Sequence, residues 1–179
     1  MSVFFDAFEF SKCLLNRFSK NSGYPVNEFN GKIVGFDYGT HKIGVSISDA
    51  EYNFAFPKTV LIGEWRDIDN ACKEIIKYCN DNHILFVVFG YPIKNNGELN
   101  ENCNRILQIA NFLDKKGFEI LLFDERFSTK ASVAVFNYEK RRNNKKNILE
   151  NKYDDAGAAS IILQDVLKIL NQIKQKSVI

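Results

Sequence analysis

The sequence has few of the residues that build disulfide frameworks or zinc sites. It contains four cysteines without a CxxC pair, and only two histidines. Small secreted scaffolds depend on paired cysteines, and structural zinc sites on clustered cysteine and histidine. Both classes are therefore excluded, and we expect the four cysteines to be reduced thiols.

Long apolar runs and a strong excess of charge are also absent. No stretch approaches the roughly 20 apolar residues that a membrane helix needs, and the chain begins with Asp6 and Glu9 where a secretory signal would be basic. We therefore expect a cytoplasmic protein that does not contact membranes. The 24 basic and 22 acidic residues leave a net charge of only +2, which argues against a protein that coats DNA non-specifically. Any contact with nucleic acid should be local.

The chain has the size of one folded domain preceded by a short segment. Its 179 residues are 45% apolar, which is enough for one substantial core. Apolar residues recur at helical spacing over 4–18, and residues 19–31 are rich in Ser, Asn, Gly and Pro. We predict an N-terminal helical extension and linker in residues 1–30 and one domain in residues 31–179.

Within that domain the pattern is a hairpin followed by alternating strands and helices. Strands are predicted at 32–39, 43–49, 55–62, 84–90 and 118–126. Helices are predicted from 66 onward, over 99–116, after a cap at Ser128, and after a cap at Asp154. This order predicts an α/β fold with a mixed sheet, in which an antiparallel hairpin is followed by parallel strands and helices flank the sheet.

Acidic residues fall at three predicted element boundaries. Asp37 closes the first strand, and Asp155 lies in the first turn of the final helix. Asp124 and Glu125 close the last strand. Carboxylates that converge from distant segments can hold Mg²⁺ or Mn²⁺ and activate water for phosphodiester cleavage. The alternative is that each acid is only a helix cap or a strand-end charge.

Spacing alone does not decide which acid of the pair Asp124 and Glu125 would bind metal. The two point to opposite faces of a continuing strand, although the strand could end between them. The next residue, Arg126, could grip a phosphate in a bidentate way or form an ion pair with Asp124. Both alternatives remain open at this point.

Three lysines are candidate contacts for a phosphate backbone. Lys42 lies beside the predicted hairpin, and Lys145 and Lys146 lie in a basic, asparagine-rich stretch over 138–152. Basic side chains that precede the acidic start of the final helix could guide nucleic acid toward the carboxylates. The same composition is typical of a solvated loop, so we hold the two interpretations as equal.

Four motifs, in this order, resemble the YqgF family of pre-16S ribosomal RNA nucleases, relatives of the RuvC Holliday-junction resolvases. They are FDYGTHKIGVSISD, FGYPIKNNGELN, FDERFST and DDAGAASIIL, and the resemblance runs from about residue 32 to 170. It implies an RNase H-like nuclease domain in residues 31–179 and metal-dependent activity. It also implies a role in trimming the 5′ end of the small-subunit rRNA precursor.

The resemblance further implies a set of site residues. It carries over Asp37 and Asp155 as metal ligands, with the DER segment supplying the third, for which we take Glu125 while keeping Asp124 as a catalytic candidate. The expected cofactor is Mg²⁺ or Mn²⁺, and the expected partner is nucleic acid, either pre-rRNA or branched DNA.

Three rival functions remain to be weighed. The first is a Holliday junction resolvase-like DNA nuclease, and the second is a non-catalytic RNA-binding or ribosome-assembly protein on the same fold. The segment DYGT also resembles the phosphate loop of the actin and sugar-kinase superfamily. Those enzymes close two such domains over ATP, whereas 179 residues hold only one, so we disfavour this third reading.

Overall fold

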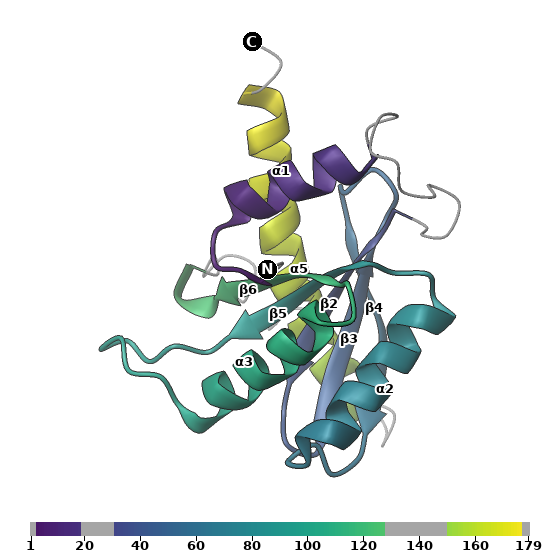
Figure 1. The fold of residues 1–179 in the computed structure, drawn as a ribbon, viewed down its shortest axis with the longest axis vertical. Coiled ribbons are helices and arrows are strands. Elements are labelled where there is room, and N and C mark those ends of the chain that lie inside the picture. The colour runs from purple at the N-terminus through teal and green to yellow at the C-terminus, as the bar shows by residue number, and fades with distance from the viewer. Residues whose placement is uncertain (1–2, 19–30, 128–149, 177–179) are drawn as a thin grey trace.

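The computed structural model describes residues 3–18, 31–127 and 150–176 (Figure 1). The side chains of residues 15–18, 127, 150–155 and 176 are outside that description. The predicted cap at Ser128 and the lysines Lys145 and Lys146 therefore lie outside the described residues. No described helix is long and apolar enough to cross a membrane.

Six strands of the described residues form one mixed sheet. Their order across the sheet is β1-β6-β5-β2-β3-β4. They are β1 (Val3–Phe4), β2 (Ile33–Tyr38), β3 (Lys42–Ser48), β4 (Ala55–Ile62), β5 (Phe86–Tyr91) and β6 (Glu119–Asp124). β2, β3 and β4 pair antiparallel, whereas β1, β6, β5 and β2 run parallel. The predicted fold class, a hairpin followed by parallel strands, is confirmed.

Helices cover both faces of this sheet. They are α1 (Ala7–Phe18), α2 (Ile68–Asp81), α3 (Glu101–Asp114) and α5 (Glu150–Lys176), with a 3₁₀ turn, η1 (Glu125–Phe127), after β6. α2 and α3 pack on one face and α1 and α5 on the other (Figure 1). Polar caps begin the crossover helices: Asp67 accepts the backbone N–H of Asp69, and Asn100 accepts that of Cys103 at 2.9 Å.

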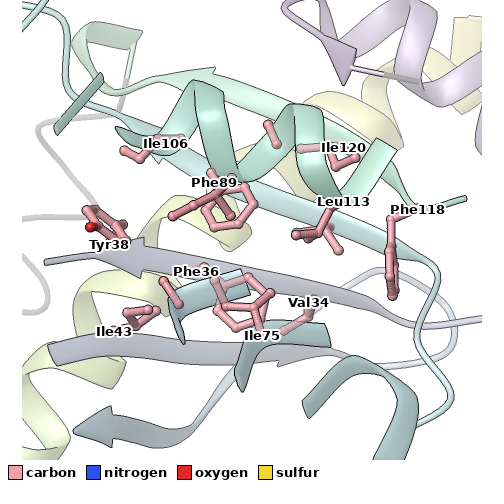
Figure 2. Packing of buried hydrophobic residues seen from close by; sticks show 14 of the residues in the cluster. Val34, Phe36, Tyr38, Ile43, Ile75, Phe89, Ile106, Leu113, Phe118 and Ile120 are labelled. Carbon is pink, nitrogen blue, oxygen red and sulfur yellow. The ribbon is translucent and has the colours of Figure 1, made fainter. Parts of the chain in front are cut away.

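Aromatic and aliphatic side chains fill the face under α2 and α3. Phe36 of β2 stacks on Phe89 of β5, with ring centroids 5.4 Å apart. Figure 2 shows Ile75 of α2 and Leu113 of α3 closing over these rings. All four side chains are fully buried. Because strand residues alternate between faces, the neighbours of Phe36 and Phe89 in β2 and β5 point toward α5.

α5 approaches the other face most closely at a glycine. A Cβ on Gly35 of β2 would lie 2.6 Å from Ser46 Oγ and 2.9 Å from Leu163 Cβ. Ser46 Oγ donates a hydrogen bond to the Ala159 carbonyl of α5 at 2.9 Å. Farther along the helix, Asn171 donates to the Tyr52 carbonyl, near the start of β4. α5 therefore runs antiparallel to β2, with its first half toward the carboxyl end of that strand.

The structure corrects three predicted boundaries. The first helix begins at Ala7, because Phe4 belongs to β1 and pairs with Leu121; a strand of two residues leaves no periodic signal.

The final helix begins at Glu150, so Asp154 is not its N-cap and Asp155 lies in the second turn. Residues 150–153 include no glycine or proline, so nothing stops the helix from extending backward. The last strand ends at Asp124, which separates Asp124 from Glu125.

The packing of α1 predicts that the N-terminal segment contributes to global stability. Phe10 is fully buried, and its ring contacts Phe86 of β5 with centroids 5.9 Å apart. Phe10→Ala should lower the free energy of unfolding by about 3 to 5 kcal/mol in urea denaturation. The control is Phe8→Ala on the same helix, where the side chain is 47% exposed. It should cost less than about 1 kcal/mol. A Phe10→Ala protein with an unchanged main transition would show that α1 unfolds separately.

Candidate active site

Asp37 lies on the α5 face near the carboxyl end of β2. It is two residues beyond Gly35, and side chains two residues apart in a strand share a face. β2 pairs with β5 through Phe36 and Phe89, so the next residues along, Asp37 and Gly90, stand side by side. Asp37 is partly exposed. This position allows its carboxylate to meet both solvent and groups that lie over Gly90.

Glu125 occupies the space over Gly90. A Cβ built on Gly90 would lie 2.5 Å from Glu125 Oε1 and 2.6 Å from Ile162 Cδ1 of α5. Glycine leaves the room that these side-chain ends occupy, because a larger residue would push the Glu125 carboxylate and the Ile162 methyl group aside. Since Gly90 adjoins Asp37, the Asp37 and Glu125 carboxylates are neighbours across the end of the sheet. The strand ends after Asp124, which frees Glu125 to turn onto this face.

The electrostatics of Glu125 agree with this proximity. Burial is the main cause that raises the pKa of Glu125 from its ordinary 4.5 to about 7, and the charges of Asp37 and Asp124 add to the effect. Desolvation and like charge both disfavour the ionised form of a carboxyl group. Simultaneous ionisation of Asp37 and Glu125 is therefore unfavourable in the metal-free protein, and a cation between them would make it favourable.

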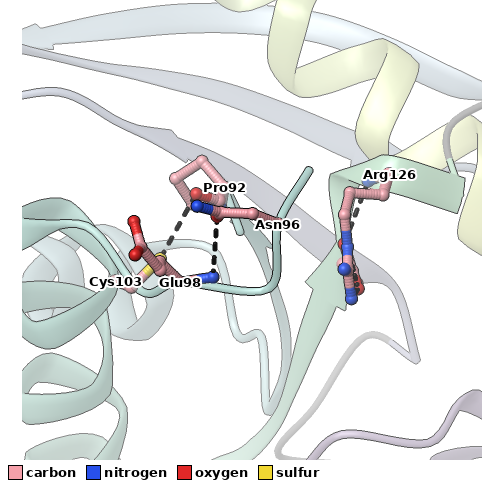
Figure 3. A network of polar contacts seen from close by, with 6 residues as sticks. Pro92, Asn96, Glu98, Cys103 and Arg126 are labelled. Atoms are coloured by element: carbon pink, nitrogen blue, oxygen red, sulfur yellow. Dashed lines mark hydrogen bonds and ion pairs between the residues drawn. The ribbon is translucent and has the colours of Figure 1, made fainter. Parts of the chain in front are cut away.

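Asp124 has a different partner. Its carboxylate accepts hydrogen bonds from Arg126 Nη2 at 2.6 Å and Nε at 3.0 Å, and from the Arg126 backbone N–H at 3.0 Å (Figure 3). These bonds hold the pKa of Asp124 below its usual value. Of the two alternatives for Arg126, the ion pair with Asp124 is therefore present. The Arg126 side chain is still 36% exposed and retains access to solvent.

The third predicted ligand is described only by its backbone. Asp155 precedes Ala159 by one helical turn, and Ala159 lies over Gly35. Four helical residues advance about 6 Å and two strand residues about 7 Å. The Asp155 backbone is thus roughly level with Asp37, since α5 runs antiparallel to β2. Among the side chains that the structure describes, no group of three or more potential metal ligands occurs.

Of the three lysines predicted to contact nucleic acid, the structure describes only Lys42. Lys42 is exposed at the first position of β3, in the hairpin that carries Asp37.

Gly90 was missed as a site residue in the sequence. Its signal was a glycine inside an otherwise continuous apolar strand, which marks close approach of another group.

Comparisons with known proteins agree with this architecture. A family model described as "RuvX: Holliday junction resolvase" matches residues 31–169. A protein of Orientia tsutsugamushi named "Putative pre-16S rRNA nuclease" is 35% identical over 144 residues, 80% of this chain and 87% of the relative. A protein of the same name from Rickettsia felis is 32% identical over 155 residues, 84% of this chain and 94% of the relative.

A solved structure shares the fold. RuvC of T. thermophilus, determined in complex with a Holliday junction substrate, superposes with a TM-score of 0.52 at 9% identity. The match covers 82% of this chain and 95% of that chain. At this identity the likeness concerns the fold alone, which is RNase H-like.

The raised pKa of Glu125 predicts that stability falls as the pH rises. A carboxyl whose folded-state pKa is about 7, against 4.5 when unfolded, stabilises the fold fully below pH 4.5 and loses that contribution up to pH 7. The loss should be roughly 2 to 3 kcal/mol in the metal-free protein. Glu125→Gln should remove this dependence and be more stable than the wild type at pH 8.

Urea unfolding at pH 5 and pH 8 in the presence of a chelator measures the effect. The matched control is Glu51→Gln, which changes an exposed glutamate in the turn between β3 and β4. That variant should follow the wild-type pH dependence. If the free energy of unfolding changed equally with pH in the wild type and in Glu125→Gln, the raised pKa of a buried Glu125 would be contradicted.

Proposed function

The chain belongs to the RuvX family, and on that premise we propose that it is a divalent-metal-dependent nuclease that matures the 5′ end of pre-16S rRNA. The observation that carries the proposal is the meeting of Asp37 and Glu125 on one face, at the carboxyl ends of the parallel strands. Two carboxylates brought together at a cost in electrostatic energy are typical of a cation site. The names of the two relatives support the choice of RNA substrate.

The donor set suits a hard divalent cation. Asp37, Glu125 and Asp155 offer only oxygen ligands, which Mg²⁺ and Mn²⁺ prefer. The residues present fit such an ion, because a positive charge would offset both the burial and the repulsion that raise the pKa of Glu125. When bound, the ion supplies an activated water and neutralises charge that develops on the phosphate.

The chain's own residues bind and orient the substrate. Asp124 holds Arg126 with a bidentate ion pair, and the guanidinium keeps an exposed part that can reach a phosphate oxygen. We assign Asp124 to this positioning role and Glu125 to metal. Lys42, Lys145 and Lys146 are the further proposed phosphate contacts. They would add affinity that carries no sequence information.

Compartment and domain organisation complete the proposal. The cysteines Cys13, Cys72, Cys79 and Cys103, all among the described residues, form no disulfide in the structure, which supports the cytoplasm as its place of action. We place the nuclease domain in residues 31–179, a choice that the family match over 31–169 supports. The described part of the predicted extension, β1 and α1 in residues 3–18, packs on this domain.

A second candidate substrate is a four-way DNA junction, because the matching family model is described as a Holliday junction resolvase. A metal site recognises phosphates and is compatible with either substrate. The third candidate, a non-catalytic RNA-binding protein, predicts affinity without cleavage. One assay with both substrates separates the three functions.

We expect cleavage of a precursor rRNA fragment in Mg²⁺ or Mn²⁺ and none in excess chelator. Ca²⁺ should bind but support little cleavage, since its looser coordination positions the reacting groups poorly. Gel analysis of both labelled substrates, with each metal added alone, measures this. Faster cleavage of the junction would assign the DNA substrate, and full activity in chelator would contradict the metal mechanism.

Asp37→Asn should abolish cleavage while preserving the fold. The substitution removes a ligand charge at nearly constant volume and relieves repulsion with Glu125, so thermal stability should hold or rise slightly. RNA affinity in chelator should stay close to that of the wild type. The control Asp81→Asn neutralises an exposed acid at the end of α2 and should leave cleavage unchanged. Wild-type cleavage by the Asp37→Asn protein would favour the non-catalytic function.

A further inference from the structure

Phe5 is an exposed aromatic residue at the carboxyl end of the sheet. It follows β1, which pairs with β6 through Phe4 and Leu121, so its backbone is fixed beside that strand. Figure 1 shows the turn between β1 and α1 near the ends of β5 and β6. The residue is 61% exposed. Burying a phenylalanine is worth about 1.5 to 3 kcal/mol, so a ligand that covered this ring would gain part of that free energy.

The ring of Phe5 is anchored on Tyr91, on the face of the sheet that α2 and α3 cover. It contacts the Tyr91 ring at a centroid distance of 5.9 Å and an interplanar angle of 75°. Tyr91 is buried, directly follows Gly90, and pairs with Asp124 of β6. A T-shaped contact occupies at most one face of a ring, so at least one face of Phe5 stays open.

We propose that Phe5 is a stacking platform for an unpaired nucleobase of the substrate. Bases of single strands stack on aromatic side chains regardless of sequence, and this is a common mode of single-strand binding. Asp124 pairs with Tyr91, so the guanidinium that Asp124 holds lies at the same end of the sheet as Phe5, where a phosphate of the same strand would pass. The metal-binding carboxylates lie on the opposite, α5 face over Gly90, which precedes Tyr91 in β5, so a bound strand would cross the end of the sheet to reach them.

The size of the exposed surface favours a nucleobase over a protein. One phenylalanine offers about 150 to 250 Å² in total, whereas a stable protein interface needs roughly 800 Å² per partner. A flat ring next to a guanidinium matches a base and its phosphate. Phe5 also lies outside residues 31–169, so the platform belongs to the extension and not to the segment that the family model matches.

The inference rests on the proposed nuclease function, and a fluorescence experiment tests it separately. The chain has one tryptophan, Trp65, which is 7% exposed. Phe5→Trp therefore adds an exposed reporter. Single-stranded RNA or DNA, titrated in chelator so that no cleavage occurs, should quench its emission. Oligonucleotides with abasic sites should quench far less, because they lack the stacking group.

Phe54→Trp is the matched control for the reporter. Phe54 is also 61% exposed but lies in the turn before β4, next to Ala55, which pairs with Ser48 at the far end of the sheet. Its emission should not respond to the oligonucleotides. Equal quenching of both reporters would overturn the proposal. Emission that changes with protein concentration alone would also overturn it, because it would indicate a second copy of the chain on this surface.

Affinity measurements with other variants complete the test. Phe5→Ala and Phe5→Leu should bind single strands roughly ten-fold more weakly than wild type, and Phe5→Trp should bind at least as well. Leucine keeps an apolar contact with Tyr91 but offers no aromatic face, so it separates stacking from packing. Wild-type affinity in Phe5→Ala would overturn the proposal.

The two functional proposals fail in different ways. Quenching in a protein that never cleaves would support the platform and contradict the nuclease mechanism. Cleavage without quenching would contradict the platform alone. Quenching by either RNA or DNA supports the inference. The nucleic acid that quenches more strongly shows whether the platform prefers a strand with ribose or with deoxyribose.

Discussion

The contact of α5 with the sheet at Gly35 is the constraint on which the site depends. Ser46 Oγ bonds the Ala159 carbonyl, and Leu163 stands so close that no side chain fits on Gly35. Interiors are packed too tightly to absorb an extra methyl group without a shift. The helix is thereby held at one height and one direction over β2, which brings its first half to the level of Asp37.

A second glycine, Gly90, determines where the Glu125 carboxylate lies and therefore its pKa. Gly90 leaves the volume that the Glu125 carboxylate fills, between Ile162 of α5 and the end of β2. The same confinement removes water from Glu125 and places it near Asp37, which raises its pKa. The packing at Gly90 is therefore the origin of the unfavourable electrostatics. It buries the Glu125 carboxyl and holds it near Asp37, so ionisation of both groups is disfavoured without a cation.

The sequence predicted the fold well because most elements carry strong local signals. β4 was predicted over the same residues that form it, and the stop after α3 came from Gly117, whose φ of 89° suits glycine. Asp37 and Glu125 were predicted at strand ends because polar residues interrupt apolar runs there. The start of α5 was predicted five residues too late, since Asp154 looked like a cap while the residues before it are equally able to be helical. β1 and the contact of Phe5 with Tyr91 depend on tertiary pairing and leave no local pattern.

The pairing of β1 also has a consequence for how the chain folds during synthesis. Val3 pairs with Ile120, so β1 finds its neighbour only after more than a hundred further residues have been made. Contacts so distant in sequence form late, because the intervening loop must close first. β1 thus pairs after the rest of the sheet has formed, and it then covers part of the outer edge of β6, which would otherwise stay open to strands of other chains.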